Sequence, residues 1–327
     1  MLVDHINNSN SDSSPLLQMK GLRIEGLSDK GWQEIVCGID LQLNRGEILG
    51  LIGESGAGKS TIGLAAMGFA RDGCRITEGE INFDGIELQK APEWQKRKLR
   101  GTRISYVAQS AAAAFNPAHR LINQFTEGPV DHDLLSEAKA KEKGRALYRS
   151  LDLPDPDYIG ERWPHQVSGG QLQRMMVAMS MSCEPDLIIF DEPTTALDVT
   201  TQIEVLKTIK EIVIDKNVAA IYITHDLAVV AQLADHLMVL RHGNLIEVNS
   251  TGQILKSPKQ EYTRNLLDAR SRNEKITAQI PNPKTLLSVE SVTAGYGKGP
   301  DILQDVSILV EKGRTVAVVG ESGSGKS

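Results

Sequence analysis

Short apolar runs alternate with helix-like stretches along most of this 327-residue chain. Two of the runs, at residues 187–190 and 219–223, are apolar almost throughout, which is typical of central strands in a parallel sheet. An amphipathic stretch at 201–213 lies between them and has the spacing of a helix. Because strands and helices alternate, the pattern predicts an α/β fold with a mostly parallel core sheet and helices on both of its faces.

The first 90 residues have a different pattern, in which short strand-like runs are separated by turns. The runs lie at 22–24, 35–36, 39–43 and 48–52. Residues 74–88 contain two tight-turn sequences, Glu78-Gly79 and Asp84-Gly85, and predict a β-hairpin beside the core. We therefore expect an N-terminal antiparallel β subdomain.

Helical spacing dominates between Gln109 and Gln166, where no strand-like run occurs. The helix-like stretches lie at 121–125, 134–143 and 146–151. We expect an inserted helical subdomain over about 110–180, following a strand at 104–108 that ends at Gln109. A basic stretch at 93–100 predicts a solvated helix ahead of that strand.

The apolar run at 48–52 leads into a glycine-rich phosphate loop, G-x-x-x-x-G-K-S, and Thr61 then opens a helix-like stretch. The loop consists of Gly53, Glu54, Ser55, Gly56, Ala57, Gly58, Lys59 and Ser60. Its glycines allow backbone N–H groups to surround the phosphates of a nucleotide, Lys59 can reach the β- and γ-phosphate oxygens, and the Ser60 hydroxyl can hold Mg²⁺. A helix N-terminus behind the loop also favours anions.

Two carboxylates follow the buried strand at 187–190. Asp191 is expected to hold Mg²⁺ directly or through water. Glu192, beside it at the mouth of the strand, is expected to polarise the attacking water as general base. His225 ends the next strand, but a histidine in that position, taken alone, is readily explained as a packed or solvated imidazole.

Composition and charge narrow the possible functions. The net charge of −6 does not support general nucleic-acid binding. Cys37, Cys74 and Cys183 form no closely spaced pair, so neither a disulfide framework nor a zinc site is indicated. Residues 1–16 are rich in Asn, Ser and Asp and are expected to be a disordered tail. No run of about 18 apolar residues occurs, so a membrane role would act through partner subunits.

Near the C-terminus, residues 320–327 repeat residues 53–60 at an offset of 267, with a single substitution. This internal repeat predicts a tandem arrangement of two similar domains. The predicted divisions are a first domain at 17–268, a polar linker at 269–284 and a truncated second domain at 285–327. The second phosphate site is expected to be incompetent because no helix follows it, and the apolar strand at 316–319 to lack most of its covering.

Taken together, these residues resemble the ATP-binding cassette (ABC) ATPases, a P-loop NTPase family, over roughly 17–267. Besides the phosphate loop, the resemblance is carried by Gln109, the signature sequence at 167–171, the acidic motif at 187–192, Ala196-Leu197-Asp198 and His225. It implies that Gln109 touches Mg²⁺ or the attacking water and reports the nucleotide state to the helical subdomain. It also implies that His225 hydrogen-bonds the γ-phosphate.

The resemblance gives the signature residues Ser168, Gly170 and Gln171 a different role. In this family they contact the γ-phosphate of ATP bound to an opposite cassette, so a second cassette, in trans or in a homodimer, is an expected partner. Taken alone, Ser168 is a helix N-cap, and the two roles are compatible because a helix N-terminus attracts phosphate. For adenine stacking, Trp32 in the first domain and Tyr296 in the second are the aromatic candidates.

Finer similarity points to the subgroup that energises uptake of peptides, nickel and related solutes. It is carried by Phe115-Asn116-Pro117, Trp163-Pro164-His165-Gln166, Ser257-Pro258 and Tyr262-Thr263-Arg264. It implies an ATP-hydrolysing, peripheral subunit at the cytoplasmic face of the inner membrane that drives import through transmembrane permease subunits docked near 109–125. A solute-binding protein would be an indirect partner. Two alternatives stay open: a soluble ABC ATPase acting on nucleic acid or ribosomes, and a nucleotide-binding remnant without turnover.

Overall fold

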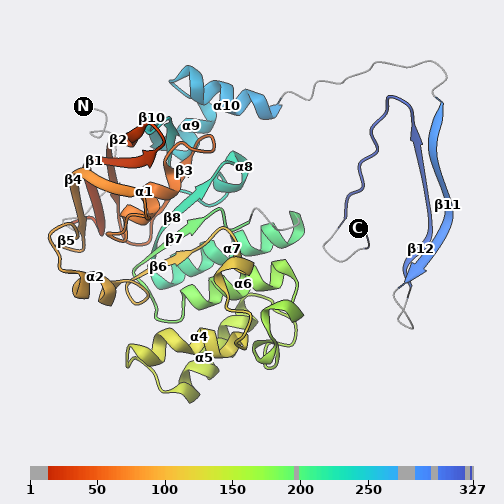
Figure 1. Ribbon diagram of the computed structural model, residues 1–327, viewed down its shortest axis with the longest axis horizontal. Coiled ribbons are helices and arrows are strands. Elements are labelled where there is room, and N and C mark those ends of the chain that lie inside the picture. The colour runs from red at the N-terminus through yellow and green to blue at the C-terminus, as the bar shows by residue number, and fades with distance from the viewer. Residues whose placement is uncertain (1–13, 195–198, 272–283, 296–300, 321–324, 326–327) are drawn as a thin grey trace.

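Two β-sheets form the body of the protein in the computed structural model, which describes residues 14–194, 199–271, 284–295, 301–320 and 325 (Figure 1). The six-stranded core sheet has the order β10-β9-β3-β8-β7-β6 and is parallel except for β10 at one edge. Its strands are β3 (Ile48–Ile52), β6 (Ile104–Val107), β7 (Leu187–Asp191), β8 (Ala219–Thr224), β9 (His236–Arg241) and β10 (Asn244–Ser250). The predicted α/β fold with a mostly parallel core sheet is confirmed.

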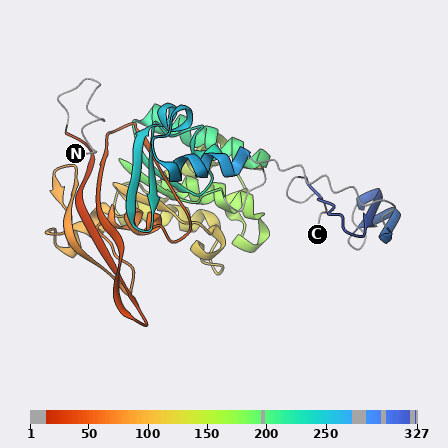
Figure 2. The same cartoon turned by 90° about the horizontal axis from the view of Figure 1, so that it is seen from above.

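The second sheet is the antiparallel subdomain that the first 90 residues predicted. Its order is β2-β1-β4-β5, with β1 (Leu17–Ser28), β2 (Gly31–Leu43), β4 (Cys74–Phe83) and β5 (Ile86–Glu87). The strands are longer than the short runs suggested, and Figure 2 shows β1 and β2 projecting beyond the core sheet.

The expected turn at Glu78-Gly79 is wrong, because β4 continues through it. Gly79 has φ 98° and faces a bulge in β1, where an added Cβ would lie 2.6 Å from the Cα atom of Leu22. The glycine therefore allows a close approach between two strands and does not reverse the chain. The second predicted turn, Asp84-Gly85, does join β4 to β5.

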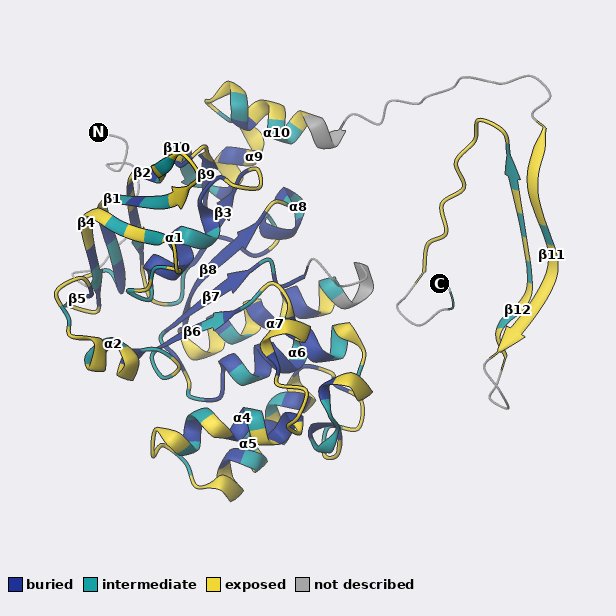
Figure 3. Ribbon diagram, viewed as in Figure 1, coloured by how far each residue is buried: buried dark blue, intermediate teal, exposed yellow. Residues whose placement is uncertain are grey.

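Helices cover both faces of the core sheet, and the two faces belong to two apolar clusters (Figure 3). The helices are α1 (Lys59–Ala65), α2 (Glu93–Leu99), α3 (Ala111–Ala114), α4 (Leu121–Asp131), α5 (Glu137–Ser150), η1 (Ile159–Glu161), η2 (Pro164–Gln166), α6 (Gly169–Ser180), α7 (Val199–Lys216), α8 (Leu227–Val230), α9 (Thr251–Lys256) and α10 (Glu261–Ser271). Helix α1 packs between the two sheets, whereas α6, α7 and α8 pack on the opposite face. None of the helices within the described residues combines the length and apolar character needed to cross a bilayer.

The helices from α3 to α6 occupy the stretch where an inserted helical subdomain is expected, and no described strand interrupts them. The linker expected from residue 269 starts differently, because α10 extends to Ser271. Residues 272–283 and 1–13, in the linker and the expected tail, lie outside the described residues. Leu16, placed in that tail, is buried and directly precedes β1.

A separate hairpin of β11 (Thr285–Gly295) and β12 (Asp301–Glu311) follows α10 (Figure 1). Both strands are largely exposed (Figure 3). The strand expected at 316–319 does not form, because no described strand pairs with these residues. The corresponding strand of the first domain is β3, which β8 and β9 pair with on both sides.

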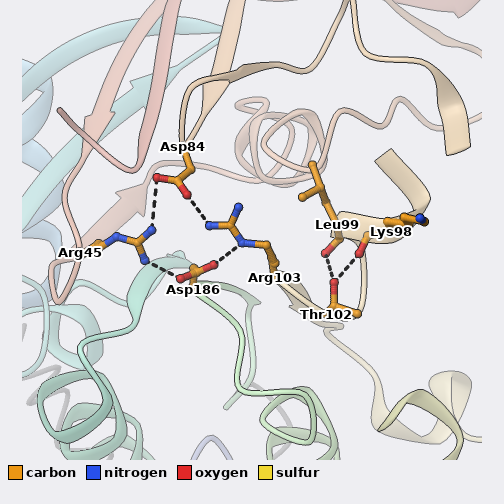
Figure 4. A network of polar contacts seen from close by, with 7 residues as sticks. All are labelled: Arg45, Asp84, Lys98, Leu99, Thr102, Arg103 and Asp186. Atoms are coloured by element: carbon orange, nitrogen blue, oxygen red, sulfur yellow. Dashed lines mark hydrogen bonds and ion pairs between the residues drawn. The ribbon is translucent and has the colours of Figure 1, made fainter. Parts of the chain in front are cut away.

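A ring of four alternating charges joins the antiparallel sheet to the core sheet (Figure 4). Arg45 follows β2 and Asp84 follows β4, whereas Arg103 and Asp186 immediately precede β6 and β7. Each carboxylate forms ion pairs with both guanidinium groups: Arg45 lies 2.5 Å from Asp186 and 3.3 Å from Asp84, and Arg103 lies 2.6 Å and 2.5 Å from the same two residues. The ring therefore connects strand ends that are far apart in sequence.

Candidate functional site

The phosphate loop connects β3 to α1 by a tight backbone path that residues other than glycine rarely adopt. Gly53, Gly56 and Gly58 all have positive φ, and a Cβ on Gly53 would lie 2.2 Å from the carbonyl oxygen of Leu240. Lys59 turns back into the loop, where its Nζ donates to the carbonyl oxygens of Gly53 at 2.7 Å and Glu54 at 2.8 Å. The loop backbone is thus held around the lysine ammonium group.

Burial of Lys59 lowers its pKa, while the negative charges of Glu192 and Asp191 oppose that shift. Its residue surface is 6% exposed. The ammonium group is therefore placed in a poorly solvated position with two carboxylates nearby, where an anionic ligand would interact with it more strongly than at the surface.

The Ser60 hydroxyl and the Asp191 carboxylate meet at the carboxyl edge of the core sheet. Ser60 Oγ donates to Asp191 Oδ1 at 2.9 Å, although the two residues are 131 positions apart. Two neighbouring ligands of an octahedral Mg²⁺ lie about 3.0 Å from each other when each is about 2.1 Å from the ion. This oxygen pair therefore fits the predicted Mg²⁺ site in both chemistry and spacing.

Glu192 lies at the centre of the remaining polar contacts. His225 Nδ1 is 3.0 Å from Glu192 Oε1, and Gln109 Nε2 donates to Glu192 Oε2 at 3.2 Å. Glu192 has φ 49°, a left-handed conformation that is costly for a residue with a side chain, and its N–H donates to the carbonyl oxygen of Ile223 at 2.9 Å. The strained turn at the end of β7 aims this carboxylate toward Gln109 and His225. Within the described residues, Gln109 forms no hydrogen bond with Asp191 or Ser60.

One contact in the site was missed by sequence reasoning. Tyr106 on β6 donates from its hydroxyl to Asp191 Oδ2 at 2.5 Å. Burial raises the pKa of Tyr106, and the Asp191 carboxylate raises it further. The sequence signal was a tyrosine within a mostly apolar strand. The strand pattern alone does not show whether the hydroxyl of such a tyrosine binds a buried partner or is partly exposed to solvent.

The phosphate loop and the polar residues around Glu192 line a cavity of 580 Å³. Its lining consists of Ile35, Ser55, Gly56, Ala57, Gly58, Lys59, Ser60, Thr61, Gln109, Asp191, Glu192 and His225. Most of the predicted phosphate-loop residues are therefore brought together with the residues predicted for Mg²⁺ and for catalysis. Gly53 and Glu54 lie behind the lining, where their carbonyl groups hold Lys59.

The cavity also bears on the candidates for adenine contact. Trp32 does not line it; its ring lies under the guanidinium group of Arg75, 4.1 Å from the centroid. Ile35, three residues further along β2, lines the cavity in its place. Tyr296 lies outside the described residues, as do residues 196–198, which carry part of the family resemblance.

The signature residues are not part of this cavity. Ser168 and Gln171 form a reciprocal cap at the start of α6: the Gln171 N–H donates to Ser168 Oγ at 3.3 Å, and the Ser168 N–H donates to Gln171 Oε1 at 3.0 Å. Ser168 is exposed and Gly170 is half-buried. The N-terminus of α6 is thus preformed, with Ser168 exposed, and lies outside the cavity of the same chain.

Comparison with known proteins agrees with this geometry. A family model described as ABC transporter matches residues 36–195. The chain is 36% identical over 269 residues to the oligopeptide transport ATP-binding protein OppD of Lactococcus lactis subsp. cremoris, covering 82% of this chain and 80% of the relative. It is 37% identical to the probable D,D-dipeptide transport ATP-binding protein DdpD of Escherichia coli, covering 78% of each. The glutathione import ATP-binding protein GsiA of Salmonella typhimurium is 32% identical over 97% of this chain and 57% of the relative.

Solved structures show the same fold. The dimeric, ADP- and phosphate-bound ATP-binding cassette MJ0796 superimposes with a TM-score of 0.65 at 21% identity, covering 72% of this chain and 98% of the other. The protein cbiO1 from Clostridium perfringens gives a TM-score of 0.64 at 22% identity, covering 79% and 98%. The chain therefore belongs to the ABC transporter ATPase family and, within it, to the group of the oligopeptide and dipeptide ATP-binding proteins.

Proposed function

We propose that this protein hydrolyses ATP to drive the import of peptides or related small solutes through separate membrane subunits. The observation that carries the proposal is the meeting of Ser60, Asp191 and Glu192 at the mouth of a cavity lined by the phosphate loop. Relatives named for oligopeptide transport, dipeptide transport and glutathione import support the choice of solute class.

In the proposed reaction, Lys59 and the loop amides bind the phosphates of ATP and neutralise their charge. Mg²⁺, held by Ser60 and Asp191, would supply further positive charge at the phosphates. Glu192 accepts a proton from the attacking water, and Gln109 orients its carboxylate through the hydrogen bond described above. His225 supplies a hydrogen-bond donor for the γ-phosphate, which would replace its contact with Glu192.

The exposed N-terminus of α6 supports the proposal that a second cassette completes the site. Ser168 is exposed, Gly170 and Gln171 are half-buried, and none of the three lines the cavity of their own chain, which suits contact with ATP bound to another cassette. The name of one solved relative describes a dimer of cassettes, which is consistent with such an arrangement.

The permease subunits are proposed to dock on the surface of the helical subdomain after Gln109. A cavity of 380 Å³ on α4 and the preceding loop is lined by residues that include Asn116, His119 and Gln124. Gln124 holds this loop by donating to the carbonyl oxygens of Asn116 at 3.0 Å and His119 at 3.1 Å. Because the loop follows β6 and Gln109, which hydrogen-bonds Glu192, binding here can be communicated to the nucleotide site. Such a subunit would lie peripherally on the cytoplasmic face of the membrane.

The test is release of phosphate from ATP by the purified chain, alone and with its membrane subunits in proteoliposomes. Glu192→Gln is expected to slow release by about 100-fold or more, since removal of a general base has this effect, while ATP binding is kept. Sedimentation at saturating Mg-ATP should show the variant as a dimer. Release that is unchanged in Glu192→Gln, or equally fast in Lys59→Ala, would show that this site does not perform the reaction.

A further inference from the structure

The aspartate of the proposed Mg²⁺ site is held by a second hydroxyl, from Tyr106. The register of the core sheet pairs Tyr106 with Ile189, two residues before Asp191 on the neighbouring strand. Because side chains two positions apart share a face, Tyr106 and Asp191 lie on the same face of the sheet, the one that α1 covers. A tyrosine is long enough to reach along β7, and its hydroxyl lies 2.5 Å from Asp191 Oδ2.

The two hydroxyl groups bind different oxygens of the same carboxylate. Ser60, from the start of α1, donates to Oδ1, whereas Tyr106, from β6, donates to Oδ2. Asp191 itself is 5% exposed. With both oxygens engaged from two elements, rotation of the carboxylate about its Cβ–Cγ bond requires breaking at least one charge-assisted hydrogen bond.

We propose that Tyr106 is a positioning residue for metal binding, because its hydrogen bond to Oδ2 keeps Asp191 Oδ1 directed at the Ser60 hydroxyl. The inference depends on the proposed function, in which these two residues hold Mg²⁺ with ATP. Tyr106 itself makes no contact with the phosphate loop cavity, whose lining does not include it. Its effect therefore passes through Asp191.

Phenylalanine would fill almost the same space in β6, so packing alone does not account for the hydroxyl. Loss of the donor would leave Oδ2 of a nearly buried carboxylate without this partner, and Ser60 alone would then oppose rotation of the carboxylate.

The experiment compares the affinity for ATP in excess MgCl₂ with that in EDTA, by calorimetric titration of the full chain. Their ratio is the gain in affinity due to the metal. In Tyr106→Phe this gain is expected to fall by about five- to tenfold, with the affinity in EDTA unchanged, because one charge-assisted hydrogen bond is lost only from the metal-binding carboxylate.

The matched control is Tyr222→Phe, which also removes a tyrosine hydroxyl from the core sheet. Tyr222 is on β8, next to the strand of Asp191, but on the opposite face of the sheet. Tyr222 lies 3.2 Å from Thr194 Oγ1 and does not contact Asp191, so the metal-dependent gain should stay at the wild-type value. In an Asp191→Asn background, adding Tyr106→Phe should have no further effect on the gain, because the group through which it acts is already altered.

Three outcomes would overturn the inference. In the first, Tyr106→Phe keeps the wild-type gain. In the second, it weakens ATP binding equally with and without metal, which would indicate a general packing defect. In the third, the losses caused by Tyr106→Phe and Asp191→Asn simply add. If instead the wild-type chain shows no gain from Mg²⁺ at all, the proposed function itself fails, and the two failures are thereby distinguished.

Discussion

Replacing Asp186 by asparagine tests whether the ring of four charges holds the antiparallel sheet to the core sheet. Asp186 accepts from both Arg45 and Arg103, and its side chain is 26% exposed, so it is the least exposed member of the ring. The asparagine oxygen can keep one of the two hydrogen bonds, but neither guanidinium group keeps its ion pair with this residue. The change therefore removes two ion pairs without changing the size of the side chain.

The expected cost follows from the partial burial of the ring. Fully exposed ion pairs contribute about 0.2–1 kcal/mol each, and the upper end of that range applies to networks with good geometry. Two lost pairs then amount to about 1–2 kcal/mol, which corresponds to a decrease of roughly 3–6 °C in the melting temperature of a domain of this size. Screening at 1 M salt, where the Debye length is about 3 Å, should reduce the difference.

The assay is thermal unfolding of the wild type and Asp186→Asn at low and high NaCl. Asp157→Asn is the matched control, because it breaks an aspartate–arginine pair with Arg149 in which both side chains are about half exposed, at 51% and 54%. It should shift the melting temperature by no more than about 1 °C. The KM for ATP should stay unchanged in both variants. Equal shifts for the two variants, or a shift in Asp186→Asn that does not respond to salt, would refute the reasoning.

Three further predictions concern core packing, stability at acid pH and contact with the adenine base of ATP. Gly50→Ala should destabilise the chain by about 1–3 kcal/mol in urea unfolding, because the new Cβ would lie 2.4 Å from Cγ2 of Val230 in a filled core. The Arg103 hydrogen bond lowers the pKa of Asp84, so the stability that Asp84 contributes is present above its unfolded pKa and lost as the pH falls through its folded one. The melting temperatures of the wild type and Asp84→Asn should therefore differ by a constant amount above about pH 5 and converge below about pH 4. Ile35→Ala should weaken ATP binding by about threefold in titrations, because Ile35 lines the cavity, whereas Trp32→Ala should leave it unchanged.

The core of the site could be predicted because its parts are set by local sequence and one rule of sheet geometry. The apolar runs at 48–52, 187–190 and 219–223 all became neighbouring parallel strands. The carboxyl ends of parallel strands meet at one edge of a sheet, so the residues that follow these runs are necessarily near one another. The contact between Ser60 and Asp191 follows from that arrangement and needs no other information.

The contacts that were missed depend on register between distant segments. Tyr106 reaches Asp191 only because β6 pairs with β7 in one register, and a shift by one residue would move its side chain to the other face. The sequence Glu78-Gly79 predicted a turn because glycine readily adopts positive φ. The positive φ of Gly79 is instead required by the bulge in β1, and that bulge cannot be recognised in the sequence of β4. The ring of four charges was not predicted for the same reason, since its members come from four different strand ends.

The register of some strand pairs is found in two places in this chain. The hairpin of β1 and β2 in the first domain corresponds to the hairpin of β11 and β12 near the C-terminus. In the first hairpin, Leu17 pairs with Leu43 and Leu22 pairs with Ile39, with a bulge between them at Gly21. The Gly21 N–H donates to Asp40 Oδ1 at 2.6 Å. All four paired apolar residues are almost completely buried by the rest of the domain.

The second hairpin repeats this register without the same burial. Leu287 pairs with Val310 and Val292 with Val306, and the bulge falls at Ser291, whose N–H donates to Ser307 Oγ at 3.0 Å. Leu287 is 53% exposed, and within the described residues β11 and β12 form a sheet of two strands only. The same pairing, with a bulge and a side-chain acceptor at the same place, is therefore present both with and without a covering core. The two hairpins share their apolar pattern and this bulge, so we infer that these local features contribute to the register of β1 and β2.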